Sequence, residues 1–366
     1  MGPHTPGFVG DTHLASEIAE IGVMLLMFGV GMHFSLADLW AMRAVAVPGA
    51  FIQIAVATAL GAGVACFWGW TFGAGLVFGL ALSVASTVVL LRALHSLKDV
   101  DSPDGKIAIG WLVVEDVAMV LTLVLLSALF GHSDDPDAPA GSSIWLSFAL
   151  ALGKVAVFIA FMLVFGTRLF PWLLQRAERV GSRELFTLAV IALALGVAFG
   201  SAKLFGCSFA LGAFFAGMVV NQSDSTHRAA ETLQPLQDAF GALFFVAIGM
   251  LFDPMILLRE PLKVLIVLAI IIIGKSLAAF GIVLLLRRSL STALTVSAAL
   301  AQIGEFSFIL AAMGVAYGLI SSDARNLIIA GAIASIALNP LVFSVAAWLG
   351  RVLTRPKAAR KITPAI

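Results

Sequence analysis

Two adjacent carboxylates, Glu115 and Asp116, lie within a long apolar stretch that runs from Gly110 to Phe130. About 20 apolar residues are enough for a helix to cross a bilayer. A charged side chain near the membrane centre costs about 2.5–3.5 kcal/mol on insertion scales, so an acid there is a functional-site hypothesis. We therefore expect this pair to carry ions or protons. Adjacent residues point about 100° apart on a helix, so both cannot face one small cation equally, and we favour Asp116 as the ligand.

Two other apolar segments carry polar residues that predict interrupted helices. One contains Ser86 and Thr87 in LSVASTVVLL, and the other contains Gln302, Gly304 and Glu305 in AQIGEFSF. Transporters build ion sites near the membrane midplane from discontinuous helices, whose freed carbonyls and hydroxyls coordinate cations. Two alternatives stay open at this point. The hydroxyls could bond to their own helix backbone, and Glu305 could lie near a segment end and reach the interface.

Lys275 lies near the centre of the apolar segment LIVLAIIIIGKSLAAFGIVLLL. From there its ammonium group cannot easily reach the membrane surface. A buried lysine must pair with an anion or lose its proton. Asp116 and Glu115 are the expected partners.

The composition predicts that these residues sit in a multi-span membrane protein. The chain of 366 residues is 61% hydrophobic and 12% charged, whereas soluble domains have about 25% charged residues. The long, continuously apolar segments indicate helices rather than barrel strands. We expect about eleven spanning helices: Ser16–Met32, Val45–Phe67, Phe72–Leu94, Lys106–Phe130, Ile144–Phe170, Arg183–Gly200, Phe205–Val220, Leu236–Leu251, Pro261–Leu286, Ser291–Ala316 and Asn326–Leu349. The interrupted third and tenth segments suggest inverted repeats, with segments one to four and six to eleven as the halves.

Positive charge is distributed unequally between the two sides of this arrangement. The side reached after the first segment, side A, holds Arg43, Arg92, Lys98, Lys106, Arg168, Arg176, Arg179, Arg183, Arg228, Arg287, Arg288, Arg351, Arg355, Lys357, Arg360 and Lys361. The opposite side, side B, holds only Lys203, Arg259, Lys263 and Arg325. Cytoplasmic loops carry the excess of lysine and arginine. Side A and the C-terminus are therefore predicted to be cytoplasmic.

Several stretches together resemble the Kef-type members of monovalent cation:proton antiporter family 2. They are EIGVMLLMFGVGMHFS, SVASTVVLLRAL, IGWLVVEDVAMVLTLVLL, SFALGAFFAGMVV, LFFVAIGMLFDP and AQIGEFSFIL, and they follow the same order as in the family. The branch of glutathione-gated potassium efflux systems is the most similar. The resemblance implies an all-α membrane protein with sodium/proton-antiporter-like inverted repeats and two discontinuous crossing helices. It further implies a homodimer and a core domain that moves against a dimerisation domain.

The resemblance also assigns roles to individual residues. The family's essential aspartate corresponds to Asp116 and its partner lysine to Lys275. The crossing of the broken helices corresponds to Ser86, Thr87 and the region from Gln302 to Glu305. The resemblance also marks a candidate regulatory loop, NQSDSTHRAAETLQP, which contains Asn221, Asp224, His227, Arg228 and Glu231. It occupies the place where regulated members of the family contact their cytosolic nucleotide-binding domain.

Three departures from the family accompany this resemblance. The chain starts where the second family helix is expected to end, so the first two family helices are expected to be missing. The nucleotide-binding domain usual in this branch is not expected within this chain. The residue before the aspartate is Glu115, where relatives commonly carry Asn or Gln, so an additional proton site is an open alternative. The expected organisation is an N-terminally incomplete exchanger domain over residues 1–351 and a basic cytoplasmic tail over 352–366.

The function expected is antiport of a monovalent cation, with potassium favoured by the resemblance, against protons by alternating access at Asp116. The main alternative is a gated cation channel or efflux system without strict proton coupling. An enzyme is not expected, because no HExxH motif or serine–histidine grouping lies within the spans. No bound cofactor and no nucleic-acid partner are expected. The expected location is the bacterial inner membrane, as a multi-pass protein, with a cytosolic nucleotide-binding domain or subunit as a candidate partner.

Overall fold

The computed structural model describes residues 10–33, 36–87, 89–90, 93–94, 102–130, 144–207, 209–223 and 226–353. Within these residues the chain is helical and contains no strand. The helices are α1 Thr12–His33, α2 Leu36–Phe67, α3 Phe72–Ser83, α5 Pro103–Phe130, α6 Ile144–Phe161, η2 Met162–Gly166, α7 Thr167–Arg179, α8 Arg183–Phe205, α9 Phe209–Val220, α10 Thr226–Leu251, α11 Ile256–Arg259, α12 Pro261–Ala269, η3 Ile270–Gly274, α13 Lys275–Leu285, α14 Leu290–Ala299, α15 Glu305–Ala316 and α16 Ser322–Leu353. The prediction of an all-α membrane protein is confirmed.

Helix length separates the continuous spans from the interrupted ones. In the described part of the chain, six helices are long and apolar enough to cross a membrane. They correspond to α2, α6 with η2 and α7, α8, α10, α12 with η3 and α13, and α16. Four apolar helices are shorter, namely α3, α9, α14 and α15. Three of these four border the interruptions that the sequence predicted, because the expected third segment stops at Ser83 and the expected tenth is divided into α14 and α15.

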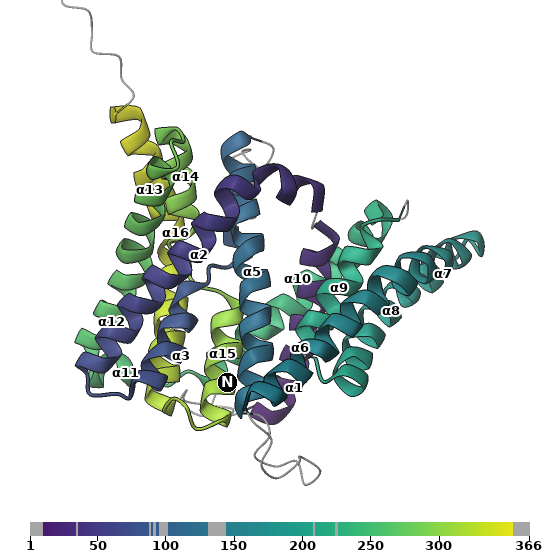
Figure 1. The fold of residues 1–366 in the computed structure, drawn as a ribbon, viewed down its shortest axis with the longest axis horizontal. Coiled ribbons are helices and arrows are strands. Elements are labelled where there is room, and N and C mark those ends of the chain that lie inside the picture. The colour runs from purple at the N-terminus through teal and green to yellow at the C-terminus, as the bar shows by residue number, and fades with distance from the viewer. Residues whose placement is uncertain are drawn as a thin grey trace, which may run out of the picture.

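The helices form two groups, which Figure 1 shows side by side. The crossing bundle contains α2, α3, α5 and α12–α16, and the lateral bundle contains α1 and α6–α10. Helix α5 lies at the centre of the view and contacts α6 of the lateral bundle. The acidic pair of α5 is therefore carried by a helix at the boundary between the two groups.

The lateral bundle is held together by close approach of helix backbones. A Cβ atom on Gly31 of α1 would collide with the carbonyl oxygen of Phe214 in α9, and one on Gly217 of α9 would collide with the carbonyl oxygen of Phe28. Small residues at membrane helix interfaces allow the backbones to approach this closely. The close contact supplies van der Waals attraction, which is needed because lipid is as apolar as the side chains and provides no hydrophobic driving force.

The crossing bundle is tied together by polar contacts at one end of α5. Asp104, in the first turn of α5, accepts hydrogen bonds from the hydroxyls of Ser291 and Thr292 at the start of α14. The side chain of Ser289 caps the same end of α14 by accepting from the Thr292 backbone N–H. These contacts fix the start of the helix that carries the acids relative to one of the interrupted helices.

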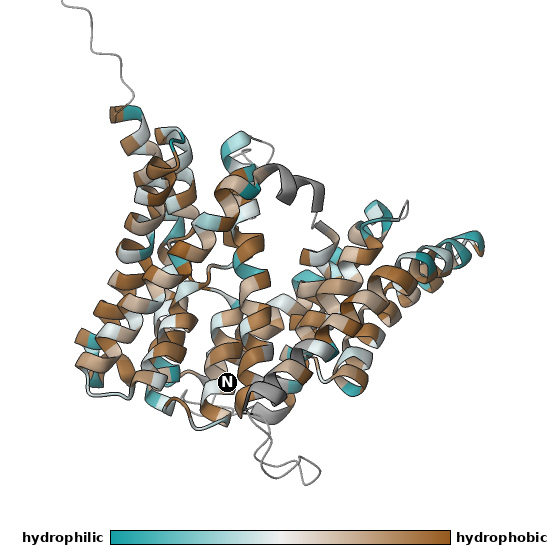
Figure 2. Ribbon diagram, in the orientation of Figure 1, coloured by the Kyte–Doolittle hydropathy of each residue, from teal (hydrophilic) through white to brown (hydrophobic). Residues whose placement is uncertain are grey.

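The hydropathy of most helices fits a membrane, whose interior is apolar and whose surfaces are polar. Figure 2 shows hydrophobic residues over the middle of most helices and hydrophilic residues concentrated at their ends. The start of α5 and the α13–α14 turn, both predicted on side A, lie at the upper end of the molecule. Helix α11, predicted on side B, lies at the lower end. The alternation of loops in the sequence prediction therefore agrees with the arrangement of these elements.

Candidate functional site

The first interruption follows α3, where the chain becomes extended from Val84 to Ser86 before turning helical again at Thr87. An interruption frees backbone groups that must be satisfied inside the protein, since lipid offers no hydrogen bonds. The Gln53 amide donates from Nε2 to the carbonyl oxygen of Ser83 at 3.1 Å. The backbone N–H of Ala85 donates to Oε2 of Glu115 at 3.1 Å. Side chains from α2 and α5 thus take the place of the missing helical hydrogen bonds.

The second interruption separates α14 from α15 and is capped in the same way. Lys275 Nζ donates to the carbonyl oxygen of Gln302 at 3.0 Å. Asn339 Nδ2 of α16 donates to the carbonyl oxygen of Ala298 at 3.1 Å. Both donors approach the carbonyl end of α14, where the helix dipole favours positive charge.

The two interruptions cross each other in direct contact. The Gln302 side chain accepts from the Ser86 backbone N–H at 2.9 Å and donates to the Ser86 carbonyl oxygen at 3.0 Å. At Gly304, an added Cβ would lie 2.5 Å from the Cβ of Ser86. Glycine is therefore required at position 304 by the proximity of the other chain segment. The predicted crossing of two discontinuous helices is present.

Both carboxylate oxygens of Glu115 accept hydrogen bonds at this crossing. The side chain is completely buried. Its Oε2 accepts from Ala85 and its Oε1 accepts from the indole N–H of Trp111 at 3.2 Å. Glu115 and the buried Lys275 interact electrostatically. Among the described residues, however, no ion pair within 4.0 Å joins Lys275 to a carboxylate.

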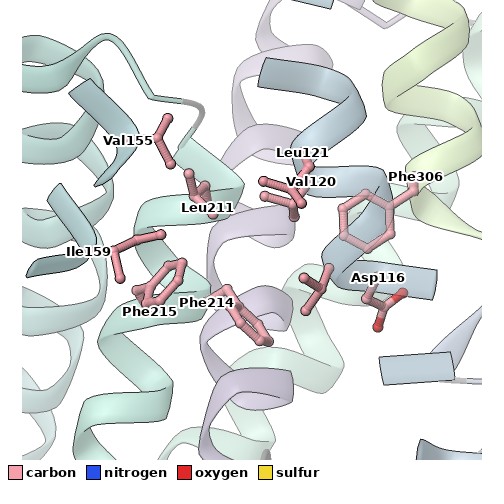
Figure 3. A pocket seen from close by; sticks show the side chains of 10 residues that line it. Asp116, Val120, Leu121, Val155, Ile159, Leu211, Phe214, Phe215 and Phe306 are labelled. Atoms are coloured by element: carbon pink, nitrogen blue, oxygen red, sulfur yellow. The ribbon is translucent and has the colours of Figure 1, made fainter. Parts of the chain in front are cut away.

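Asp116 lies next to Glu115 but has a different environment. Its Oδ2 accepts from the Thr87 hydroxyl at 2.7 Å, whereas its buried Oδ1 has no hydrogen-bond partner. Asp116 lines a cavity of about 210 Å³ whose other walls are Val117, Val120, Leu121, Val155, Ile159, Leu211, Phe214, Phe215 and Phe306. Figure 3 shows the apolar side chains gathered from both bundles, with the Asp116 carboxylate at their edge and directed away from them. The aspartate thus borders an apolar cavity at the bundle boundary.

Glu305 is the first residue of α15 and is only 2% exposed. Its Oε2 accepts from the Ser86 hydroxyl at 3.2 Å, and its buried Oε1 has no partner. Glu305 also interacts electrostatically with Asp116. This burial excludes the alternative that Glu305 reaches the membrane interface.

Sequence comparison adds the family to this geometry. Residues 1–348 match the family described as sodium/hydrogen exchanger, transmembrane. The chain belongs to this family. The putative cation/proton antiporter YbaL of Escherichia coli (strain K12) is 59% identical over 344 residues, which cover 94% of this chain and 62% of YbaL. K(+) efflux antiporter 4 of Arabidopsis thaliana is 32% identical over 347 residues, which cover 94% of this chain and 57% of that protein.

This member of the exchanger family also resembles a solved structure. The sodium proton antiporter MjNhaP1 from Methanocaldococcus jannaschii superposes with a TM-score of 0.63 at 17% sequence identity. The match covers 94% of this chain and 87% of MjNhaP1. The similarity confirms the antiporter-like fold. The chain spans less than two thirds of the length of the two curated relatives described above.

The structure of this family member brings together most of the residues that the sequence singled out. Ser86, Thr87, Glu115, Asp116, Lys275, Gln302, Gly304 and Glu305 all meet at the crossing. The sequence analysis overlooked Gln53, Trp111 and Asn339. Gln53 and Asn339 could have been found as buried amides within otherwise apolar helices.

The candidate regulatory loop lies away from the crossing and differs from its predicted form. Helix α10 begins at Thr226, so His227, Arg228 and Glu231 belong to a helix rather than a loop. Arg228 pairs with Glu178 at 2.7 Å and lies over the Phe186 ring, 4.8 Å from its centroid. Asn221 follows α9 in a short turn, and Asp224 lies outside the described residues. The early helix start follows from the sequence THRAAETL, which contains good helix formers.

Proposed function

We propose that this chain forms the membrane part of a monovalent cation/proton antiporter in which Asp116 exchanges a proton for the cation. The observation that supports this most directly is the unpartnered Oδ1 of Asp116, buried beside a cavity at the boundary of the two bundles. A buried polar atom without a partner costs about 1–3 kcal/mol. A bound cation or proton would offset that cost. The family match and the antiporter names of the relatives support the same proposal.

The proposed mechanism is alternating access at this boundary. With a proton bound, Asp116 is neutral and the crossing bundle can move against the lateral bundle without a cation. With the proton released, the carboxylate takes the cation instead. Since the cavity is lined by both bundles, a shift between them would change the side of the membrane from which Asp116 is reached. Potassium is the favoured cation, because two relatives are named K(+) efflux antiporters.

Glu115 takes the role of partner to Lys275 in this proposal, one of the two expected from the sequence, and not that of an additional proton site. Both of its oxygens accept hydrogen bonds within the protein, and it interacts with Lys275 rather than facing the cavity. We assign it to balancing the charge of Lys275 and to capping the interruption after α3. The 100° step between adjacent helix positions separates this supporting acid from the exchanging one.

The test is ion exchange by the full-length protein in proteoliposomes. Asp116→Asn is expected to abolish proton movement driven by a potassium gradient. Asp323→Asn, a change at an exposed position in the first turn of α16, is the matched control and should retain it. Cation-dependent proton movement by the Asp116→Asn protein would refute the proposal. Cation flux through the unaltered protein without proton counter-flow would favour the gated channel.

The topology and assembly are further parts of the proposal. We place residues 1–351 in the membrane as an exchanger domain of the bacterial inner membrane, with side A and the basic tail 352–366 in the cytoplasm. We also propose a homodimer and a cytosolic nucleotide-binding domain or subunit that acts near His227, Arg228 and Glu231. Reporter fusions after residue 353 would test the side, and cross-linking in membranes would test the dimer.

A further inference from the structure

Four carbonyl oxygens at the crossing already accept hydrogen bonds from side chains. The Ser83 carbonyl accepts from Gln53, and the Ser86 carbonyl accepts from Gln302. The Gln302 carbonyl accepts from Lys275, and the Ala298 carbonyl accepts from Asn339. At each of these four oxygens a protein donor competes with a cation for the lone pairs, so acceptors that have no donor are the better candidates for a cation ligand.

Among the buried side-chain acceptors of the described residues that lack a partner, two are carboxylate oxygens. Oδ1 of Asp116 and Oε1 of Glu305 are both buried and unpartnered, and the side chains are 3% and 2% exposed. None of the ion pairs within the described residues involves either acid. Two buried acids repel each other when both are ionised, so that state requires a positive charge between them, and otherwise one of the two holds a proton.

The backbone of the first interruption holds the two acids at one place. Thr87 donates its hydroxyl to Asp116 Oδ2, and the preceding Ser86 donates its hydroxyl to Glu305 Oε2. Consecutive residues thus anchor one oxygen of each acid, and the second oxygen of each is left free. Phe306, the residue after Glu305, lies beside Asp116 at the edge of the cavity in Figure 3. Hydroxyls on two adjacent residues therefore place the two acids near each other.

We propose that Glu305 is the second carboxylate ligand of the transported cation, which lies between Oδ1 of Asp116 and Oε1 of Glu305. This inference rests on the proposed function at Asp116 and adds a binding residue from the opposite half of the fold. The ligand is a small monovalent cation that has lost much of its water, since both carboxylate oxygens are buried. Because one acid is on α5 and the other on α15, the cation would join the two helices when bound.

The decisive variant is Glu305→Gln, which keeps the shape and the hydrogen bond from Ser86 but removes the charge. In proteoliposomes containing the full-length protein, the apparent KM for potassium should rise by about tenfold or more, as expected for loss of a charged contact. Ser335→Ala is the control and should leave KM unchanged, because Ser335 is a buried residue of α16 whose hydroxyl donates to the Ala332 carbonyl within its own helix. Choline chloride in place of potassium chloride gives the background.

The outcomes separate this inference from the proposed function. An inactive Asp116→Asn protein together with a Glu305→Gln protein of unchanged KM would overturn the role of Glu305 alone. An active Asp116→Asn protein would overturn both. If Glu305→Gln fails to fold, Glu305→Asp decides, since it keeps the charge but withdraws the carboxylate by one methylene. A raised KM or an altered preference among potassium, sodium and lithium supports the inference, and unchanged values for both overturn it.

Discussion

The two bundles bury different kinds of side chain. Among the described residues, Ser201 is the one fully buried polar side chain of the lateral bundle. The crossing bundle buries all the others: Gln53, Ser83, Ser86, Thr87, Glu115, Asp116, Lys275, Thr292, Ser297, Gln302, Glu305, Ser307, Asn326, Ser335 and Asn339. Polar residues within the membrane are costly, so this concentration marks the bundle in which ion chemistry takes place.

The difference also concerns how each bundle is held together. Glycines bring backbones into contact in both bundles: α1 and α9 in the lateral bundle, and α2 and α3 in the crossing bundle, where a Cβ on Gly79 would collide with the carbonyl oxygen of Thr58. The crossing bundle relies in addition on side chains that cap interrupted backbone. Polar networks in an apolar interior stabilise the protein only when every member has a partner. Mutations of polar residues should therefore harm the crossing bundle most, whereas added volume at a close glycine should harm either bundle.

The largest effect is expected from Lys275→Met. Removing the Lys275 charge leaves the buried Glu115, with which it interacts electrostatically, uncompensated, and breaking a buried pair costs up to about 3–5 kcal/mol. The free energy of unfolding, measured by titration with a denaturing detergent, should fall accordingly. Adding Glu115→Gln should recover part of this loss, because the two charges interact. A double variant as unstable as the sum of the single variants would show that they do not.

Gln302→Leu should have the next largest effect. It leaves the backbone N–H of Ser86 without a partner, whereas the Ser86 carbonyl keeps the hydrogen bond from the Leu90 N–H. An unsatisfied buried group costs about 1–3 kcal/mol, and a loss in that range is expected. Gln237→Leu is the counterpart in the lateral bundle, where Gln237 Nε2 donates to the carbonyl oxygen of Leu25. Equal losses in the same unfolding measurement would remove the contrast between the bundles.

Gly217→Ala tests the packing of the lateral bundle. The added methyl group meets the carbonyl oxygen of Phe28, so α1 and α9 must separate, at about 1–3 kcal/mol for overpacking. Gly196→Ala in α8 is the control, because a Cβ there meets no atom within 4 Å. Thermal unfolding of the purified proteins in detergent should show a lower midpoint for Gly217→Ala than for Gly196→Ala. The reverse order would contradict the packing argument.

Ser201→Ala should have the smallest effect. The Ser201 hydroxyl donates to the carbonyl oxygen of Ala198 within its own helix. The Ala198 carbonyl remains part of the helix when the hydroxyl is lost, so the free energy of unfolding should change by no more than about 1 kcal/mol. A thermal unfolding midpoint that drops as far as that of Gly217→Ala would show that the lateral bundle also depends on polar contacts.

The sequence predicted which residues lie at the crossing better than it predicted their hydrogen-bond partners. Glu115, Asp116, Lys275 and Glu305 stand out because charge is rare in apolar segments, and interruptions follow from the polar residues beside them. The identity of each hydrogen-bond partner depends on how distant helices are rotated against one another, as in the pairing of Gln302 with Ser86 across 216 positions. Hydropathy does not contain that information. The start of α10 was missed because polar composition was taken to indicate a loop.

Lys275 follows directly after η3, the π-helical turn formed by Ile270, Ile271, Ile272, Ile273 and Gly274. A π-helical turn accommodates one more residue than an α-helical turn. If the same five residues formed an ordinary α-helical turn instead, no functional group would be lost, yet everything beyond the turn would be rotated by about 100°. The ammonium group would then leave the Gln302 carbonyl and face another direction. The π-helical turn before Lys275 thus sets the direction in which this lysine points, and so determines whether a positive charge is present at the centre of the protein.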